Sequence, residues 1–269
     1  MEFFDSHAHY NDEKFDEDRE KILQEIYDAG ITKFMSAGYN VKASKKGLEI
    51  ADKYDFIYTT SGISPNDITT IEDANKQIEQ LDEFIKSEME ECNKKEKKSK
   101  IVGIGEIGLD YYYDENSKDA QKWAFIEQIK LANKYKLPIV IHTREAVMDT
   151  LDILKNKQPA EYKGVFHCCP LNRELVKEAL KLGFYISFSG IVTFKNAKNA
   201  EEIVNMVPLD RILIETDSPY LSPEPVRGTR NDSRNVKYVA QKVAILKNET
   251  LENIANATFN NAKKIFKII

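Results

Sequence analysis

Four histidines lie where they could bind metal ions. His7 and His9 close an apolar run that begins at Phe3, and side chains two positions apart on a strand point the same way. Two imidazoles placed like this can occupy neighbouring positions around one metal ion. The other two histidines, His142 and His167, also end short apolar runs. A polar strand end would explain His7 and His9 alone, but the shared placement of all four histidines favours metal binding.

Two carboxylates have a matching placement. Glu106 lies late in the apolar run 101–110, and Asp217 follows the run 211–216. Four imidazoles and two carboxylates suit two divalent ions if one carboxylate bridges them, and Glu106 is the natural bridge. Asp217 could bind one ion and also accept a proton from an attacking water. Taken singly, Glu106 could be an ion-pair partner in the core and His142 a hydrogen-bonded histidine at its edge. Taken jointly, the six residues predict a centre for Mg²⁺, Mn²⁺ or Zn²⁺, with Asp217 and Glu106 as its catalytic carboxylates.

The elements that must position these residues alternate along the chain. Apolar, strand-like runs are separated by amphipathic helical segments, and such strands are typical of parallel sheets buried on both faces. Strands are expected at 2–9, 32–38, 56–63, 101–110, 138–143, 163–168, 184–189 and 211–216. Helices are expected near 16–29, 42–53, 71–92, 117–136, 145–156, 172–182, 197–206, 234–247 and 250–266.

This alternation predicts a (β/α)8 TIM barrel, and residues 1–269 are expected to form a single domain. A doubly wound open sheet is the alternative. The barrel is preferred because the carboxyl ends of its strands share one rim, which would collect all six candidate ligands. The glycines of 103–108 do not form a dinucleotide-binding fingerprint, because their spacing is wrong and no helix opens directly behind them.

Composition narrows the range of partners. A net charge of −5 argues against a surface that wraps duplex DNA, which would need many phosphate contacts. The basic run 94–100 is predicted to be a solvated loop rather than a nucleic-acid patch. Cys92, Cys168 and Cys169 suggest no disulfide framework, which fits reduced thiols in a cytosol. Without a membrane span or a secretory signal, the protein is expected to be cytoplasmic, with no membrane partner and no obligate protein partner.

Five stretches resemble the signature stretches of the TatD-type metal-dependent deoxyribonucleases, a branch of the amidohydrolase superfamily. They are His7-Ala8-His9, Gly105-Glu106-Ile107-Gly108-Leu109-Asp110, Ile141-His142-Thr143-Arg144, Val165-Phe166-His167-Cys168 and Glu215-Thr216-Asp217-Ser218-Pro219-Tyr220-Leu221. The resemblance covers essentially the whole chain. It implies a barrel, a divalent-metal centre and hydrolysis of DNA phosphodiester bonds, often by 3′→5′ exonuclease action on single strands or free ends. Carried over by motif, the first metal would be held by His7, His9, Glu106 and Asp217, and the second by Glu106, His142 and His167.

The chain departs from the family pattern outside these ligands. Ser64, Asn66 and Val226 stand where the family usually has histidines, and Cys169 stands where it usually has phenylalanine. The segments concerned line the rim around the metals. We therefore expect the departures to affect substrate choice and rate, and not the metal centre.

The predicted substrate needs cationic partners on the protein. Arg144, Arg227 and Arg230 could contact the phosphodiester, and surface ion pairing is the alternative role for each. The alternative function is a barrel amidohydrolase, esterase or lactonase acting on a small molecule. A binding scaffold on a decayed barrel is disfavoured because all six ligand positions are intact.

Overall fold

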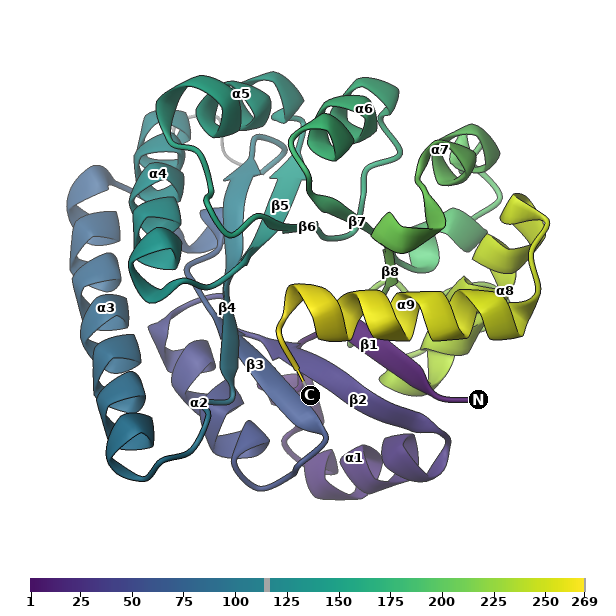
Figure 1. The fold of residues 1–269 in the computed structure, drawn as a ribbon, viewed down its shortest axis with the longest axis horizontal. Helices are drawn as coiled ribbons and strands as arrows, with labels where there is room; N and C mark the ends of the chain where they lie inside the picture. The colour runs from purple at the N-terminus through teal and green to yellow at the C-terminus, as the bar shows by residue number, and fades with distance from the viewer. Residues whose placement is uncertain (114–116, 269) are drawn as a thin grey trace. The chain divides into compact units, whose positions relative to one another are not determined.

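The computed structural model describes residues 1–113 and 117–268. In these residues, eight strands alternate with helices in the predicted order (Figure 1). The strands are β1 Phe3–Ala8, β2 Ile31–Ala37, β3 Ile57–Ser61, β4 Ile101–Asp110, β5 Ile139–Arg144, β6 Gly164–Phe166, β7 Tyr185–Phe188 and β8 Ile212–Ile214. The helices are α1 Arg19–Asp28, α2 Val41–Ala51, α3 Ile71–Lys94, α4 Lys118–Tyr135, α5 Val147–Asp152, α6 Arg173–Lys181, α7 Ala200–Met206, α8 Val236–Lys247 and α9 Leu251–Ile265.

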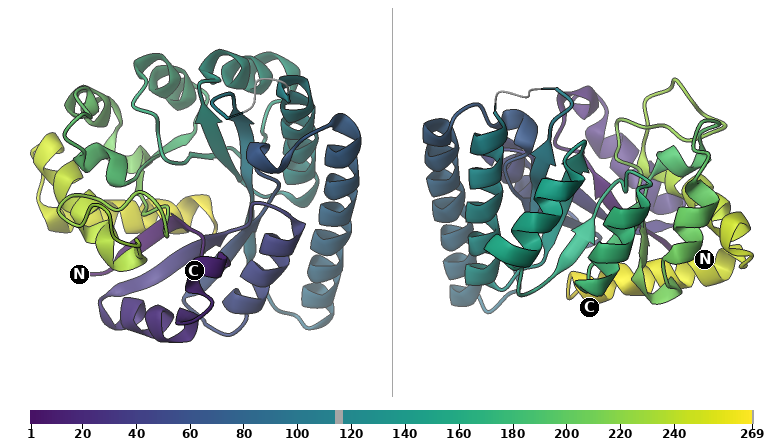
Figure 2. Two further views of the ribbon diagram at one scale, coloured as in Figure 1. Left: turned by 180° about the vertical axis from the view of Figure 1, so that it is seen from behind. Right: turned by 90° about the horizontal axis from the view of Figure 1, so that it is seen from above.

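The chain forms two compact units. The terminal unit comprises residues 1–36 and 165–268, and its strands pair in the order β6-β7-β8-β1-β2. All of these pairs are parallel, and Ala8 pairs with Ser218 just beyond β8. The last strand thus lies beside the first, as in a closed barrel and unlike a doubly wound open sheet. Helix α9 packs against β1 and β8 (Figures 1 and 2).

The central unit comprises residues 37–113 and 117–164, and contains β3, β4 and β5 as parallel neighbours. All ten residues of β4 are buried, which agrees with its mostly apolar sequence. Gly108 has φ +136°, and a Cβ there would lie 2.0 Å from the carbonyl oxygen of His142. Only glycine allows β4 to approach β5 this closely. Beside these strands, α3 and α4 lie side by side (Figure 2).

The helices lie within a few residues of the predicted ranges. Gly30 and Gly183 follow their helices with positive φ, as C-terminal glycines do. Ser117 directly precedes α4, and its hydroxyl accepts a hydrogen bond from the Gln121 side chain. The helix predicted at 145–156 is shorter, because α5 gives way to a π-helical turn at Ile153–Lys157.

Three of the strands that precede candidate ligands end earlier than predicted. β1 stops at Ala8, β6 at Phe166 and β8 at Ile214, so His9, His167 and Asp217 lie in the segments just after strands. β5, in contrast, continues two residues beyond His142. The early strand ends place these three side chains in loops. Loop backbone is less constrained than a paired strand, so the side chains can turn toward one another.

Other expectations concern the surface and the cysteines. The basic run after α3 is largely exposed, as predicted, and Lys95 pairs with Glu91. Strand β4 runs without interruption through its glycines, which confirms the rejection of a dinucleotide fingerprint. Cys92, Cys168 and Cys169 are free thiols. No helix in the described residues is both long and apolar enough to cross a membrane.

Candidate metal centre

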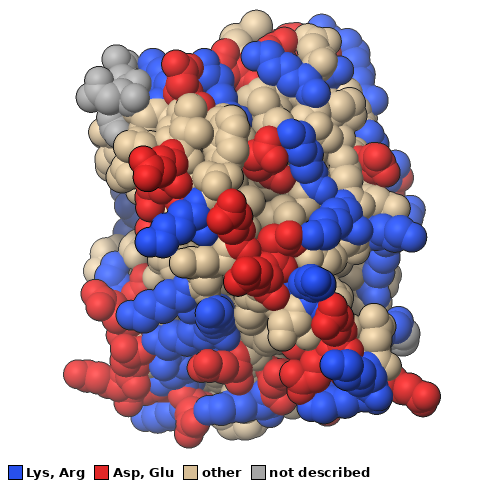
Figure 3. All heavy atoms as spheres, turned by 90° about the vertical axis from the view of Figure 1, so that its left-hand side faces the viewer, with Lys and Arg blue, Asp and Glu red and all other residues tan. Residues whose placement is uncertain are grey.

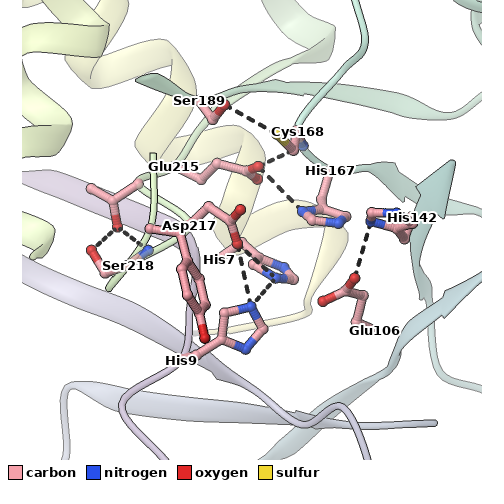
Figure 4. A network of polar contacts seen from close by, with 12 residues as sticks. His7, His9, Glu106, His142, His167, Cys168, Ser189, Glu215, Asp217 and Ser218 are labelled. Carbon is pink, nitrogen blue, oxygen red and sulfur yellow. Dashed lines mark hydrogen bonds and ion pairs between the residues drawn. The ribbon is translucent and has the colours of Figure 1, made fainter. Parts of the chain in front are cut away.

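In the terminal unit, three predicted ligands form one cluster (Figure 4). The Nε2 atoms of His7 and His9 lie 3.2 Å apart. The Oδ1 atom of Asp217 lies 3.3 Å from the Nε2 atom of His9 and 3.8 Å from that of His7. The same-side orientation expected for His7 and His9 is therefore confirmed.

Backbone pairing beyond the strand ends brings these side chains together. The Asp217 N–H donates to the His7 carbonyl at 2.9 Å, and the His9 N–H donates to the Ser218 carbonyl at 2.7 Å. Asp217 has φ +58°, a left-handed conformation that aspartate tolerates better than most residues. This turn lets the chain leave β8 while the Asp217 carboxylate faces the histidines.

Buried Asp5 secures the same region. Its carboxylate accepts hydrogen bonds from the Thr216 backbone and hydroxyl and from the Ser233 hydroxyl. Burial raises the pKa of Asp5 to about 7, although these hydrogen bonds act in the opposite direction. Asp5 thus ties β1 to the segment that carries Asp217.

The chemistry and spacing of this cluster fit a divalent cation. Two ligands bound at about 2.1 Å to one ion, at right angles, lie about 3 Å apart. The ligand atoms of His7, His9 and Asp217 all lie within 4.8 Å of one another. Imidazole nitrogen and carboxylate oxygen are donors that Zn²⁺ and Mn²⁺ accept, whereas carboxylate oxygen suits Mg²⁺. The three residues could therefore hold one ion together.

A second group in the terminal unit joins His7 to His167 and Glu215. The rings of His7 and His167 are stacked, with centroids 4.0 Å apart. The Nδ1 atom of His167 lies 3.4 Å from the Oε1 atom of Glu215, which also accepts a hydrogen bond from the Cys168 N–H (Figure 4). The ligand atoms of His7, His167 and Glu215 meet the same 4.8 Å spacing. Glu215 is fully buried, so its carboxylate belongs to the site rather than to the surface.

Sequence reasoning missed Glu215. A signal was available, because a glutamate follows directly on the apolar strand Ile212–Ile214. A charged residue in that position is expensive to bury without a partner.

The electrostatics of the cluster favour an ionised Asp217. Burial alone would raise the pKa of this carboxyl. The hydrogen bond with His9 and the charges of His9, His7 and His167 outweigh burial, so the pKa of Asp217 lies below its ordinary value. An anionic carboxylate is the form needed to bind a cation or to accept a proton.

The central unit contributes a separate pair of predicted ligands. The Nδ1 atom of His142 lies 3.1 Å from the Oε1 atom of Glu106. The Nε2 atom of His142 lies 2.9 Å from the Oδ2 atom of Asp110, a residue that sequence reasoning did not select. Burial opposes ionisation of Asp110, but His142 outweighs it through its hydrogen bond and charge, and the pKa of Asp110 is lowered. The sequence signal for Asp110 was its position at the end of β4.

The structure therefore brings the six predicted ligands together in two sets. His7, His9, His167 and Asp217 converge within the terminal unit, and Glu106 and His142 meet within the central unit. A bridge by Glu106 between two ions remains a prediction.

The three predicted substrate-binding arginines have different surroundings. Arg230 forms an ion pair with Asp18 and also donates to the Lys14 carbonyl. Arg227 is exposed, donates to the Ser222 carbonyl and covers the Phe194 ring at 4.0 Å. Arg144 lies over the Tyr112 ring at 3.6 Å. Their contacts with substrate remain predictions.

The four positions that depart from the family pattern differ in burial. Ser64 is buried and its N–H donates to the Tyr39 carbonyl, whereas Asn66 is exposed. Cys169 is buried and Val226 is half-buried. Their effect on substrate choice remains a prediction.

Comparison with known proteins gives a consistent picture. A family model for TatD related DNase matches residues 4–267. The metal-dependent hydrolase YabD of Bacillus subtilis is 40% identical over 265 residues, which cover 98% of this chain and 99% of YabD. The metal-dependent hydrolase YcfH of Escherichia coli K12 is 45% identical over 168 residues, which cover 62% of this chain and 63% of YcfH.

Solved structures agree on the fold. The crystal structure of YJJV, a TatD homolog from Escherichia coli K12, matches with a TM-score of 0.89 and 27% identity over 99% of this chain and 98% of YJJV. An organophosphorus hydrolase from Deinococcus radiodurans shares the fold at a TM-score of 0.66 and 11% identity. The predicted (β/α)8 barrel is thereby confirmed. The chain belongs to the TatD-related DNase family, a family of metal-dependent hydrolases.

Proposed function

We propose that this protein is a deoxyribonuclease that hydrolyses DNA phosphodiester bonds at single strands or free ends, with two divalent ions. The observation that carries the proposal is the convergence of His7, His9 and Asp217 on one point, in a chain of the TatD-related DNase family. Within the terminal unit, His167 with Glu215 offers further donors, and within the central unit, Glu106 with His142 offers its own pair.

The protein groups have distinct tasks in this reaction. When bound, divalent ions would polarise the phosphodiester and lower the pKa of a water. The Asp217 carboxylate, held ionised by the surrounding histidines, accepts the proton of the attacking water at Oδ1 or Oδ2. The stacked rings of His7 and His167 hold each other in place, which fixes the directions of their nitrogens.

A pocket in the central unit, lined by three lysines and by Glu49 and Asp67, supports an anionic substrate. This pocket of about 760 Å³ lies in the central unit and its lining includes Lys42, Lys45 and Lys46 of α2. Spacings of three and four residues place these lysines on one helix face. In the described part of the chain, Lys42 and Lys45 make no ion pair with a carboxylate. Ammonium groups of this kind are suited to the phosphates of a nucleic-acid strand.

Two observations relate this pocket to the candidate metal ligand Glu106. The Glu106 N–H donates to the Gly38 carbonyl at 2.6 Å, and the pocket begins two residues later at Asn40. On the pocket wall, burial raises the pKa of Asp67, and the charge of Glu106 adds to this shift. The pocket and Glu106 thus belong to neighbouring segments of the central unit.

The distribution of charge supports action at ends rather than wrapping of duplex. The net charge is −5, and the face shown in Figure 3 has basic and acidic side chains interspersed rather than a basic stripe. Wrapping a duplex would require such a stripe to neutralise many phosphates. A few lysines in one pocket would suffice for a short stretch of one strand.

The deciding experiment compares substrates on the purified protein. End-labelled single-stranded DNA, RNA, closed circular DNA and an aryl ester are assayed side by side with Mg²⁺, Mn²⁺ or Zn²⁺ and with a chelator. We expect metal-dependent loss of nucleotides from linear single strands, with closed circles resistant. Faster hydrolysis of the ester, with no cleavage of DNA, would instead establish the small-molecule hydrolase. Equal cleavage of relaxed circles and linear strands would exclude an end-acting enzyme.

A further inference from the structure

We propose that Tyr112, Tyr113 and Arg144 form a stacking platform for unpaired nucleic-acid bases beside the candidate metal ligand His142. The proposal rests on the proposed deoxyribonuclease function and names the part of the substrate that this surface recognises. It is carried by the exposure of two adjacent aromatic rings and by their packing against an arginine.

The two tyrosines are unusually open to solvent. Tyr112 is 54% exposed and Tyr113 is 69% exposed. Their neighbour Tyr111 behaves differently, because its hydroxyl donates to Asp149 at 2.7 Å and its ring is only partly exposed. The first tyrosine of the three therefore anchors the segment, and the next two present their rings outward. Adjacent exposed aromatic rings are a feature of ligand-binding surfaces.

Arg144 organises the two rings. Its guanidinium carbon lies 3.6 Å from the centroid of the Tyr112 ring and 5.0 Å from that of Tyr113. The two rings meet edge to face, with centroids 4.9 Å apart. Within residues 1–113 and 117–268, Arg144 makes no ion pair, in contrast to Arg230 with Asp18. A guanidinium stacked in this way keeps donors at its edge, which can bind a phosphate.

Strand pairing sets this platform beside His142. Asp110 pairs with Arg144 across β4 and β5, and the Tyr111 N–H donates to the Arg144 carbonyl at 3.0 Å. Asp110 also accepts a hydrogen bond from the Tyr112 N–H while its other oxygen contacts His142. One buried carboxylate thus links the platform to a candidate metal ligand, all within the central unit.

This arrangement selects a chemical class of substrate. Proteins that bind single strands without sequence preference combine aromatic rings, on which bases stack, with cations that contact the backbone. A base within a duplex has both faces covered by its neighbours and cannot use the rings. The platform therefore favours unpaired or terminal bases over paired ones, and a substrate without a base gains nothing from it.

The test measures stacking directly. A single-stranded oligonucleotide carries the fluorescent adenine analogue 2-aminopurine at its end and phosphorothioate linkages that slow cleavage. Stacking on an aromatic ring quenches this fluorophore. Titration with the Mn²⁺-loaded protein therefore measures the affinity, and the depth of the quench shows whether the base stacks on a ring. The variants are Tyr112→Leu, Tyr113→Leu and Tyr113→Phe. Tyr27→Leu, at an exposed tyrosine of α1, is the matched control.

We expect quenching with the parent protein, Tyr113→Phe and Tyr27→Leu. Removal of either platform ring should weaken binding roughly 5- to 100-fold and reduce the quench. An oligonucleotide with an abasic end should bind the parent as weakly as the normal one binds the leucine variants. Unchanged affinity and quench in both leucine variants, with unchanged melting temperatures, would overturn the platform. Cleavage of DNA by the parent in the same experiments would show that the proposed function stands without it.

Discussion

The imidazole of His142 contacts the buried carboxylate of Asp110, with Nε2 and Oδ2 2.9 Å apart. In the neutral form of His142 that could bind a metal, a hydrogen on Nε2 would donate to Asp110, and the lone pair on Nδ1 would lie on the side of Glu106, 3.1 Å away. Metal-binding histidines commonly have such a carboxylate on their second nitrogen, which fixes the tautomer and the ring orientation. We therefore expect Asp110 to leave Nδ1 of His142 available as a ligand atom.

Replacing Asp110 should weaken metal binding without removing a ligand. We expect Asp110→Asn to reduce the affinity for the ion that His142 would bind by roughly 10- to 100-fold, because Asn can turn its NH2 group instead of its oxygen toward Nε2. Isothermal titration with Mn²⁺ measures the effect, and the melting temperature of the chelated protein reports folding. Parental affinity in a folded Asp110→Asn protein would show that the contact has no bearing on the metal.

Glu215 should behave as part of the centre although sequence reasoning passed over it. Its Oε1 atom is shared between His167 and the Cys168 N–H, and the residue is fully buried. Glu215→Gln keeps an acceptor for the N–H but removes the negative charge. We expect a lower metal content at micromolar Mn²⁺, measured by inductively coupled plasma mass spectrometry after gel filtration. Glu174→Gln, on the exposed part of α6, is the control and should retain the parental content.

Asp217 should carry the proton transfer as well as binding metal. Asp217→Asn keeps the size and one oxygen but removes the basic site, and should lower kcat by about 10²–10⁴. Metal content, melting temperature and kcat are measured on the same preparation. If Asp217 only shapes the turn with its positive φ, kcat would stay within a few-fold of the parent and the melting temperature would fall. Near-parental kcat with full metal content would remove Asp217 from the mechanism.

The lysine pocket should contribute by neutralising phosphates. Lys42→Glu and Lys45→Glu should each weaken single-strand binding and lower the slope of log affinity against log salt by about 0.7 for every phosphate that is no longer neutralised. Fluorescence anisotropy between about 50 and 200 mM NaCl, the range over which such affinities fall steeply, would measure the slope. Lys76→Glu is the control, since Lys76 is an exposed residue of α3 outside the pocket lining. Equal slopes for all three variants would mean that the pocket does not contact the strand.

The buried thiols should be inert at neutral pH and destabilising in alkali. Burial raises the pKa of Cys92 to about 11, and Glu88 adds to the shift. Burial raises the pKa of Cys169 to about 12. At pH 8, iodoacetamide should label these native thiols at least about 100-fold more slowly than in urea, because so little thiolate is present.

The raised pKa values of Cys92 and Cys169 should lower the free energy of unfolding in alkali. Both folded-state pKa values lie above the value of about 8.5 for a free thiol. Their contribution to the free energy of unfolding is thus complete below about pH 8.5 and is lost as pH rises toward 11–12. Urea unfolding of the parent and of Cys92→Ala from pH 7 to 11 would measure this loss as a falling difference in the free energy of unfolding. A parent whose stability relative to Cys92→Ala stays constant over that range would contradict the assignment for Cys92.

The sequence by itself determined the strand and helix order and the six candidate ligands. Strands buried on both faces require continuous apolar runs, so runs such as Ile101–Asp110 could be identified without the tertiary structure. A histidine or carboxylate at the end of such a run is costly to bury and therefore stands out. For this reason His7, His9, Glu106, His142, His167 and Asp217 could be selected as a group.

Only the tertiary structure decided which neighbours those residues have. Asp110 and Glu215 join the site because strand pairing and a turn after β8 place them against His142 and His167. Arg144 and Arg230 look alike in the sequence, yet one stacks on Tyr112 and the other pairs with Asp18. Spacing along a chain restricts which way a side chain points within its own element. Contacts between elements depend on register and on turns, which are set by the packing of the whole unit.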